Sequence, residues 1–322
     1  MTIERMVALL VTLALSVPAV YAASPADFPN KPVRIVTSEP GGSLDFTARV
    51  MAQDLTASLG QQVIVENRGG ASGAILAQMV ARASPDGYTM LYYGSPLWIL
   101  PLLQRTSYDA MRDFSPITIA ISSPNILVVH PSLPVKTVAE LIALAQAKPG
   151  QLNYGTGATG GPSHLAAELF STMARVKFTR VPYRGNGPAV TALVGGEVHL
   201  LFASAAAVTG HIKSGRLTAL GVTSAKPSAL FPGLPAIAGA GVPGYEAEAV
   251  FGILAPAGTP RAIVNRLNRE IVGVLQQASL KEKFFGAGVE VVASTPESLA
   301  ATMKSEVARI GKLIKEAGIK VD

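Results

Sequence analysis

The chain has 322 residues, of which 49% are hydrophobic and 15% are charged, and it contains no cysteine. This composition can bury a large core and predicts about two domains; it excludes a disordered chain, a disulfide scaffold and a cysteine metal site. The formal net charge of +6 can steer anionic solutes toward the protein. Because no dense run of Lys and Arg is interleaved with aromatic residues, we predict no nucleic-acid binding.

Residues 1–22 have the layout of a secretory signal peptide. Arg5 precedes an uncharged apolar run from Met6 to Val20, and the small residue Ala22 follows at a cleavage-site position. The alternative is an N-terminal membrane anchor, for which the run is short. We therefore expect the mature protein to begin at Ala23. The lack of cysteine favours a bacterial periplasm over a eukaryotic extracellular space.

The next stretch predicts a buried strand that ends in a glycine-rich turn and continues into a helix. β-Branched residues dominate positions 33–37, Pro40, Gly41 and Gly42 follow, and apolar residues then recur at helical spacing over 44–55. The first N–H groups of a helix have no intrahelical partner, and the helix dipole places partial positive charge there. The junction is therefore typical of an anion-binding site.

Three polar residues at this junction have open roles. Ser43 is expected to cap the helix, and Asp45 lies in its first turn, where a carboxylate is stabilised by the dipole. Asp45 either only secures the helix start or also contacts a ligand. Glu39 either points to solvent or pairs with a cationic group on the ligand.

The rest of the chain alternates strands with helices. Strands are predicted over residues 63–65, 88–93, 117–121, 126–129, 152–154, 200–202 and 217–222. Helices are predicted to follow Gly73, Thr137, Gly161, Thr259 and Thr295. This alternation favours parallel, doubly wound sheets. Shorter strands after Ser115 indicate the passage to a second domain, and the apolar segment 248–256 is interpreted as the return.

A second strand, glycine-rich loop and helix start occurs at residues 152–164. Gly155, Gly157 and Gly160 match the dinucleotide-binding fingerprint in form, and Pro162 suits the first helical position. The confirming acidic residue is missing, because no Asp or Glu occurs between Glu168 and Glu197. We therefore expect an anion cradle and no cofactor.

His164 is the best placed of the four histidines, in the first turn of this second helix. The other histidines, His130, His199 and His211, show no metal-ligand spacing with it, so we expect no metal site. No G-x-S-x-G motif accompanies it, which argues against a serine hydrolase. His164 is either a structural polar residue of the helix start or a direct solute contact.

Six motifs occur in order along the chain: P-V-R-I-V-T-S-E-P-G-G-S-L-D-F-T-A-R, V-E-N-R-G-G-A-S-G-A, S-P-D-G-Y-T-M-L, V-P-Y-R-G-N-G-P-A, H-I-K-S-G-R-L-T-A-L-G-V-T-S and F-G-I-L-A-P-A-G-T-P. Together they resemble those of the Bug family, periplasmic solute receptors of tripartite tricarboxylate transporters. The resemblance runs in unbroken order from about Pro29 to the C-terminus. It departs from the family at Ser38-Glu39, usually an aromatic and a small residue, and at Ala203-Ser204, where many members have an acid or amide.

The resemblance implies an α/β, two-lobed binding protein of the type II kind. Each lobe is expected to be a mostly parallel sheet flanked by helices, with two crossover connections and a carboxylated solute between the lobes. We expect lobe I at residues 23–122 and 250–322 and lobe II at 123–249. The ligand-binding positions that the resemblance implies are Ser38, Gly41, Gly42, Ser43, Asp45, Ser95, Thr156, Gly157, Thr159, Gly160, His164, Tyr183 and Ser204, with Arg184 a further wall position.

The expected function is that of a receptor without catalytic activity. It would act as a monomer in the periplasm and deliver a small carboxylate to a tripartite tricarboxylate-type permease. Two alternatives stay open: a sensory receptor that feeds a two-component system, and a secreted α/β hydrolase or lyase. Dicarboxylates, tricarboxylates, aromatic acids and amino acids all remain candidate solutes, because backbone donors recognise only the carboxylate.

Overall fold

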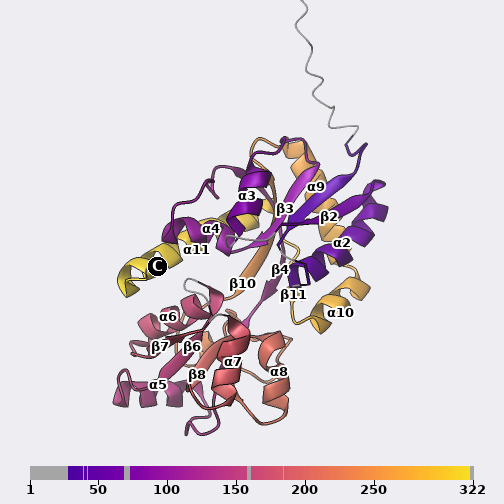
Figure 1. Cartoon of the computed structure of the whole chain (residues 1–322). Coiled ribbons are helices and arrows are strands. Elements are labelled where there is room, and N and C mark those ends of the chain that lie inside the picture. Colours follow the sequence, from indigo (N-terminus) through magenta and orange to yellow (C-terminus); the bar gives the residue numbers. More distant parts are fainter. Residues whose placement is uncertain are drawn as a thin grey trace, which may run out of the picture.

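The structure, a computed structural model, describes residues 28–38, 40–41, 43–68, 73–157, 161–183 and 185–319. It divides into two lobes, each built on one sheet, with the second lobe below the first in Figure 1. Several positions singled out by the sequence lie outside the described residues: the proposed signal peptide, Glu39, Gly42, Thr159, Gly160 and Arg184.

The first lobe contains a six-stranded sheet in the order β11-β4-β10-β3-β1-β2. Its strands are β1 (Val33–Thr37), β2 (Val63–Asn67), β3 (Thr89–Gly94), β4 (Phe114–Ser123), β10 (Ala249–Pro256) and β11 (Glu290–Val291). β1 pairs in parallel with β2 and β3, whereas β10 is antiparallel to both β3 and β4. The carboxyl ends of β1, β2 and β3 therefore share one edge of the sheet.

Helices cover both faces of this sheet (Figure 1). They are α2 (Ser43–Leu59), α3 (Ala74–Ala81), α4 (Pro96–Leu103), α9 (Arg261–Leu275), α10 (Ala278–Gly286) and α11 (Pro296–Ala317). The predicted helix start at 296 is confirmed, and α9 begins at Arg261, one residue after the predicted Pro260. The Thr295 hydroxyl caps α11 by accepting the Ser298 N–H at 3.2 Å. Ile263, Leu267 and Ile271 form the buried stripe of α9, as their spacing predicts.

The second lobe contains a five-stranded sheet in the order β7-β6-β8-β5-β9. Its strands are β5 (Asn125–Val129), β6 (Asn153–Thr156), β7 (Thr179–Pro182), β8 (Leu200–Ser204) and β9 (Thr218–Val222). Its helices are α5 (Val138–Ala147), α6 (Pro162–Ala174), α7 (Asn186–Val194), α8 (Ala205–Lys213) and the short 3-10 helix η3 (Ile237–Ala240). Pro162 is the first residue of α6, as predicted.

Each sheet has three neighbouring parallel strands joined to antiparallel ones. The sequence predicted mostly parallel sheets, and the observed sheets are mixed because strands at the lobe junction enter them in the opposite direction. β4 continues into β5 through Pro124, and β10 carries the chain back. Ala249 is paired with Ser123, so the two crossover connections lie side by side.

The core of the second lobe fixes the position of α6. Phe170 of α6 packs against Phe202 of β8, with ring centroids 5.7 Å apart, and against Tyr245, with ring centroids 6.0 Å apart. All three side chains are fully buried, and burying an aromatic side chain stabilises the fold by about 1.5–3 kcal/mol. Packing in this core therefore fixes the position of α6 relative to the second sheet.

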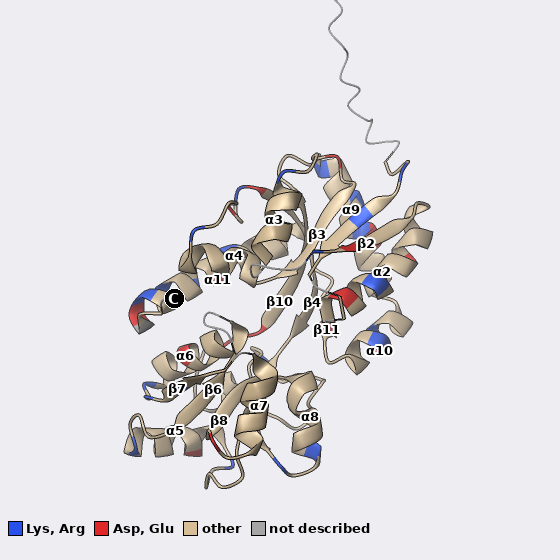
Figure 2. Cartoon of the chain, in the orientation of Figure 1, with Lys and Arg blue, Asp and Glu red and all other residues tan. Residues whose placement is uncertain are grey.

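Charged side chains are dispersed over the outer helices and loops of both lobes (Figure 2). This distribution agrees with the thinly spread net charge that the sequence indicated. None of the helices in the described part of the chain combines the length and the apolarity that a bilayer-spanning helix needs.

Candidate functional site

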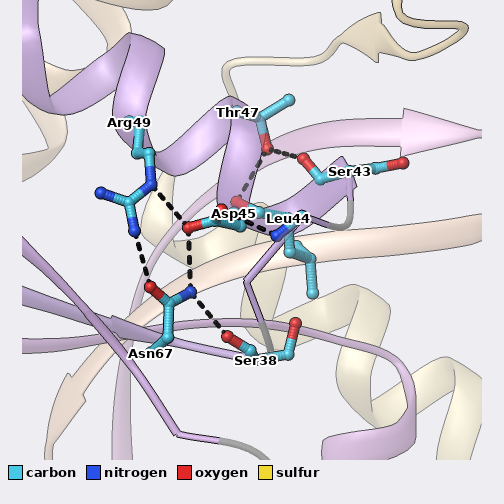
Figure 3. Close-up of polar contacts among 8 residues, drawn as sticks. Ser38, Ser43, Leu44, Asp45, Thr47, Arg49 and Asn67 are labelled. Carbon is cyan, nitrogen blue, oxygen red and sulfur yellow. Dashed lines mark hydrogen bonds and ion pairs between the residues drawn. The ribbon is translucent and has the colours of Figure 1, made fainter.

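The loop after β1 is organised by the carboxylate of Asp45, which is 7% exposed. The carboxylate accepts hydrogen bonds from Gly41 N–H at 2.9 Å, Asn67 Nδ2 at 2.9 Å and Arg49 Nε at 2.8 Å. Asn67 also donates to the carbonyl oxygen of Ser38 at 2.8 Å, so one amide ties the strand end to the helix start (Figure 3). Both sides of the loop are therefore fixed.

These contacts give Asp45 a positioning role in the loop. Burial favours its protonated form, but hydrogen bonds from Gly41 and Asn67 and the charge of Arg49 outweigh burial and lower the pKa of Asp45. Gly41 has φ of +85°, a backbone conformation that suits glycine. Ser43 is the first residue of α2 and not the residue before it, so the expected cap position is shifted by one. Solute contacts by these residues stay predictions.

The loop after β6 is held by a second polar cluster. Gly157 N–H donates to Ser163 Oγ at 3.3 Å, and Ser163 Oγ donates to Asn186 Oδ1 at 3.3 Å. Arg180 Nε donates to Thr156 Oγ1 at 3.0 Å. A Cβ atom placed on Gly157 would lie only 2.9 Å from Asn186 Oδ1. Glycine at this position therefore leaves room for the Asn186 side chain next to the loop. Sequence analysis did not predict this contact.

His164 lies in the first turn of α6, as predicted, but its side chain is only 3% exposed. Burial, aided by the positive charge of Arg180, lowers the pKa of His164 to about 4. Its Nε2 lies 3.7 Å from Glu168 Oε1, which also accepts a hydrogen bond from Tyr154. The imidazole is therefore neutral at neutral pH and is packed inside the second lobe.

Tyr183 and Ser204 lie at the ends of β7 and β8. Tyr183 N–H donates to the carbonyl oxygen of Thr156 at 2.8 Å, which joins it to the second loop. Burial and the charge and hydrogen bond of Glu197 raise the pKa of the Tyr183 hydroxyl. The partner of this hydroxyl is therefore a residue of the second lobe. Ser204 precedes α8 and is paired with Asn125 beside the crossover. Solute contacts by Tyr183 and Ser204 also stay predictions.

A pocket with about 670 Å³ of empty space, part of it open to solvent, lies between the lobes. The first lobe contributes Ser95 of the predicted set, together with α4 and α11, and the second lobe contributes α6. Residues 247–249, in the returning crossover, form the remaining wall. Figure 1 shows α6 on the side of the second lobe that faces α11. The lining is mainly apolar.

Two carboxyl groups and one guanidinium group line this pocket. Burial raises the pKa of Glu248 to about 7, and nearby Glu290, Glu246 and Glu306 add to the effect although Ser122 opposes it. Glu306 is 8% exposed, and burial raises its pKa as well.

The Glu306 carboxylate is held by neighbouring donors. Its Oε2 accepts a hydrogen bond from Trp98 Nε1 at 2.6 Å, and its Oε1 lies 3.9 Å from Arg309 Nη2. Sequence reasoning missed these residues. One signal was available, because Glu306 lies on the apolar stripe of α11 between Met303 and Ile310, where a core residue is expected.

The chain is similar to known solute receptors over nearly its whole length. Residues 47–319 match the model of the tripartite tricarboxylate transporter family receptor. Protein BugT of Bordetella pertussis is 36% identical over 324 residues, covering 98% of this chain and 99% of BugT.

Two similar solved structures hold carboxylates. The structure titled R. palustris Rpa4515 with adipate is 38% identical, covers 91% of this chain and 99% of that chain, and has a TM-score of 0.75. MatC from Rhodopseudomonas palustris with bound malate is 27% identical, covers 89% of this chain and 100% of the MatC chain, and has a TM-score of 0.70. The Bug-family resemblance and the two-lobed α/β fold predicted from the sequence are confirmed.

Proposed function

The chain belongs to the family of tripartite tricarboxylate transporter receptors, and we propose that it works as a solute receptor without catalysing a reaction. In this proposal a small carboxylate binds between the two lobes, and the loaded receptor delivers it to a membrane permease of the tripartite tricarboxylate type. Residues 1–22 direct the protein to the periplasm, where it acts as a monomer.

The observation that carries the proposal is the pair of strand, loop and helix junctions, one in each lobe. At the start of α6 the Leu165 N–H donates to the carbonyl oxygen of Gly161 at 3.0 Å. The first N–H groups of an α-helix have no partner within the helix and lie at its positive end. In the first lobe, α2 likewise begins after the loop that follows β1. A carboxylate is the kind of group that such helix starts bind.

The two carboxylate complexes support the same chemistry. Adipate and malate are both small carboxylates, and they accompany Rpa4515 and MatC, respectively. Several donors must converge to offset the cost of removing a charged carboxylate from water. Closing two lobes on the solute brings donors from both helix starts to it.

The proposal is tested with protein purified from the periplasm of an expressing bacterium. Native mass spectrometry would detect a co-purified acid, and calorimetry would measure binding of mono-, di- and tricarboxylates. Saturable binding of at least one carboxylate is expected. Binding of neutral sugars or nucleotides, with no carboxylate bound, would contradict the proposal.

A glycine substitution tests the location of the site. Gly157→Ala should weaken carboxylate binding at least tenfold, because its Cβ atom forces Asn186 to move and disturbs the second loop. Gly210→Ala is the matched control, since the added methyl group in α8 meets nothing within 4 Å. Unchanged affinity in Gly157→Ala would place the carboxylate elsewhere.

A further inference from the structure

We infer that the solute is a monocarboxylate with an uncharged apolar body, and that the pocket between the lobes holds this body and rejects a second carboxylate. The inference rests on the proposed function, because it assumes that the loops at the starts of α2 and α6 hold the first carboxylate. It names a narrower class of solute than the family assignment does.

The pocket borders elements that lie next to both loops. Ser95 lines the pocket and follows β3, which lies beside β1, the strand that leads into the first loop. Pro162 also lines the pocket and is the first residue of α6, directly after the second loop. A solute whose carboxylate lies at the helix starts can therefore extend its body into the pocket.

The walls of the pocket suit an apolar body. Ile99 of α4, Leu165 and Ala166 of α6, Phe251 of β10 and Ile310 of α11 all contribute to the lining. Burying apolar surface yields about 25 cal/mol per Å², so a hydrocarbon body gains affinity in proportion to the area it covers. A second carboxylate would lose its hydration in these surroundings.

The charges around the pocket oppose a second carboxylate. Glu248 and Glu306 line it, and Glu246 and Glu290 are close enough to act on Glu248. Arg309, the cationic residue of the lining, has two acidic neighbours, although its buried Nε has no hydrogen-bond partner among the described residues. Its Nη1 donates to the Glu246 carbonyl oxygen and lies 4.0 Å from the Glu246 carboxylate, and its Nη2 lies 3.9 Å from Glu306.

The carboxyl groups of the pocket also have partners within the protein. Glu306 accepts a hydrogen bond from Trp98 and interacts with Ser95, and Glu248 interacts with Ser122. An ammonium group on the solute would have to compete for acceptors that are already bonded. Burial keeps Glu248 partly protonated near neutral pH, with a pKa of about 7. An uncharged body therefore fits better than a cationic one.

The experiment compares three ligands of equal chain length: hexanoate, adipate and 6-aminohexanoate. Binding is followed by calorimetry and by the fluorescence of Trp98, the only tryptophan of the chain, which is bonded to the pocket residue Glu306. Hexanoate should bind at least tenfold more tightly than adipate and 6-aminohexanoate, which corresponds to about 1.4 kcal/mol. Hexanoate should also change the Trp98 emission.

The variant Glu248→Gln, assayed at pH 8, where Glu248 is ionised, removes one negative charge from the pocket and keeps the size of the side chain. It should raise the affinity for adipate at least threefold relative to the affinity for hexanoate. Glu297→Gln is the matched control on α11, because the Glu297 side chain is 68% exposed. The control should leave both affinities unchanged.

The outcomes separate this inference from the proposed function. Adipate or 6-aminohexanoate binding as tightly as hexanoate would overturn the inference and leave the receptor function standing. A wider screen in which only dicarboxylates or tricarboxylates bind would also overturn the inference and leave the receptor function standing. Binding confined to monocarboxylates would support the inference. If no carboxylate binds at all, the proposed function fails with it.

Discussion

Replacing Glu248 by Gln should stabilise the protein above neutral pH. The pKa of Glu248 is raised from its ordinary value of 4.5 to about 7, chiefly by burial and further by Glu290, Glu246 and Glu306. The folded protein therefore binds a proton at this carboxyl group more tightly than the unfolded chain does. The stability that this proton contributes is complete below pH 4.5, falls between pH 4.5 and 7, and is absent above 7.

The size of the effect follows from the pKa difference. Each pKa unit corresponds to about 1.4 kcal/mol, so ionising Glu248 in the folded state costs about 3 kcal/mol at pH 8. Glutamine carries no charge and avoids this cost. Glu248→Gln should therefore raise the free energy of unfolding by about 2–3 kcal/mol at pH 8 and leave it nearly unchanged at pH 4.5.

Urea denaturation followed by circular dichroism at pH 4.5, 6, 7 and 8 measures this difference directly. Glu297→Gln, on the exposed face of α11, controls for the general effect of removing a negative charge. The reasoning is refuted if the difference between Glu248→Gln and the parent protein does not change with pH. It is also refuted if the exposed control shows the same pH dependence.

Two further predictions concern the loops. His164 should stay neutral from pH 5.5 to 8, because burial lowers its pKa to about 4; an NMR titration showing its ring protonating near pH 6.5 would contradict the burial seen here. Asp45→Ala should lower the free energy of unfolding by about 2–4 kcal/mol, because Gly41, Asn67 and Arg49 lose their shared acceptor, and should weaken carboxylate binding at least tenfold. Urea denaturation measures the loss of stability, and calorimetry measures the loss of affinity. Unchanged carboxylate affinity in Asp45→Ala would show that Asp45 does not position the loop for binding.

The parts of the fold that the sequence predicted depend on local patterns. The strand at Val33–Thr37 and the helix that starts at Pro162 follow from β-branched residues, glycines and a proline at the first helical position. The cap at Thr295 follows from side-chain chemistry within one helical turn. Such signals act between residues close together in the chain, so one sequence is enough to detect them.

The mixed character of the sheets was not predicted, because it depends on long-range pairing. Ala249 pairs with Ser123, and Leu254 pairs with Pro116, although these residues are far apart in the sequence. Nothing in an apolar run such as 249–256 indicates whether its neighbours will be parallel or antiparallel. The family resemblance implied two crossovers but not that the crossing strands would pair with each other.

The candidate site divides in the same way. The loops were predicted from glycine-rich junctions, whereas the pocket joins residues from α4, α6, β10 and α11 that only the fold brings together. The roles of Asn67 and Asn186 were missed for the same reason, since each reaches its loop from another element. The sequence therefore predicted the positions of the two loops better than it predicted the pocket.

The pocket also connects solute binding to the crossover between the lobes. A solute can shift a receptor toward its closed form only through contacts that differ between the two forms. Glu248 lies immediately before β10 in the returning crossover, and Arg309 of α11 binds the same segment at the Glu246 carbonyl oxygen. A solute body bound in the pocket as proposed would therefore contact this segment of the returning crossover. If the loops hold the carboxylate as we propose, substitutions at Glu248 should alter which solutes close the lobes.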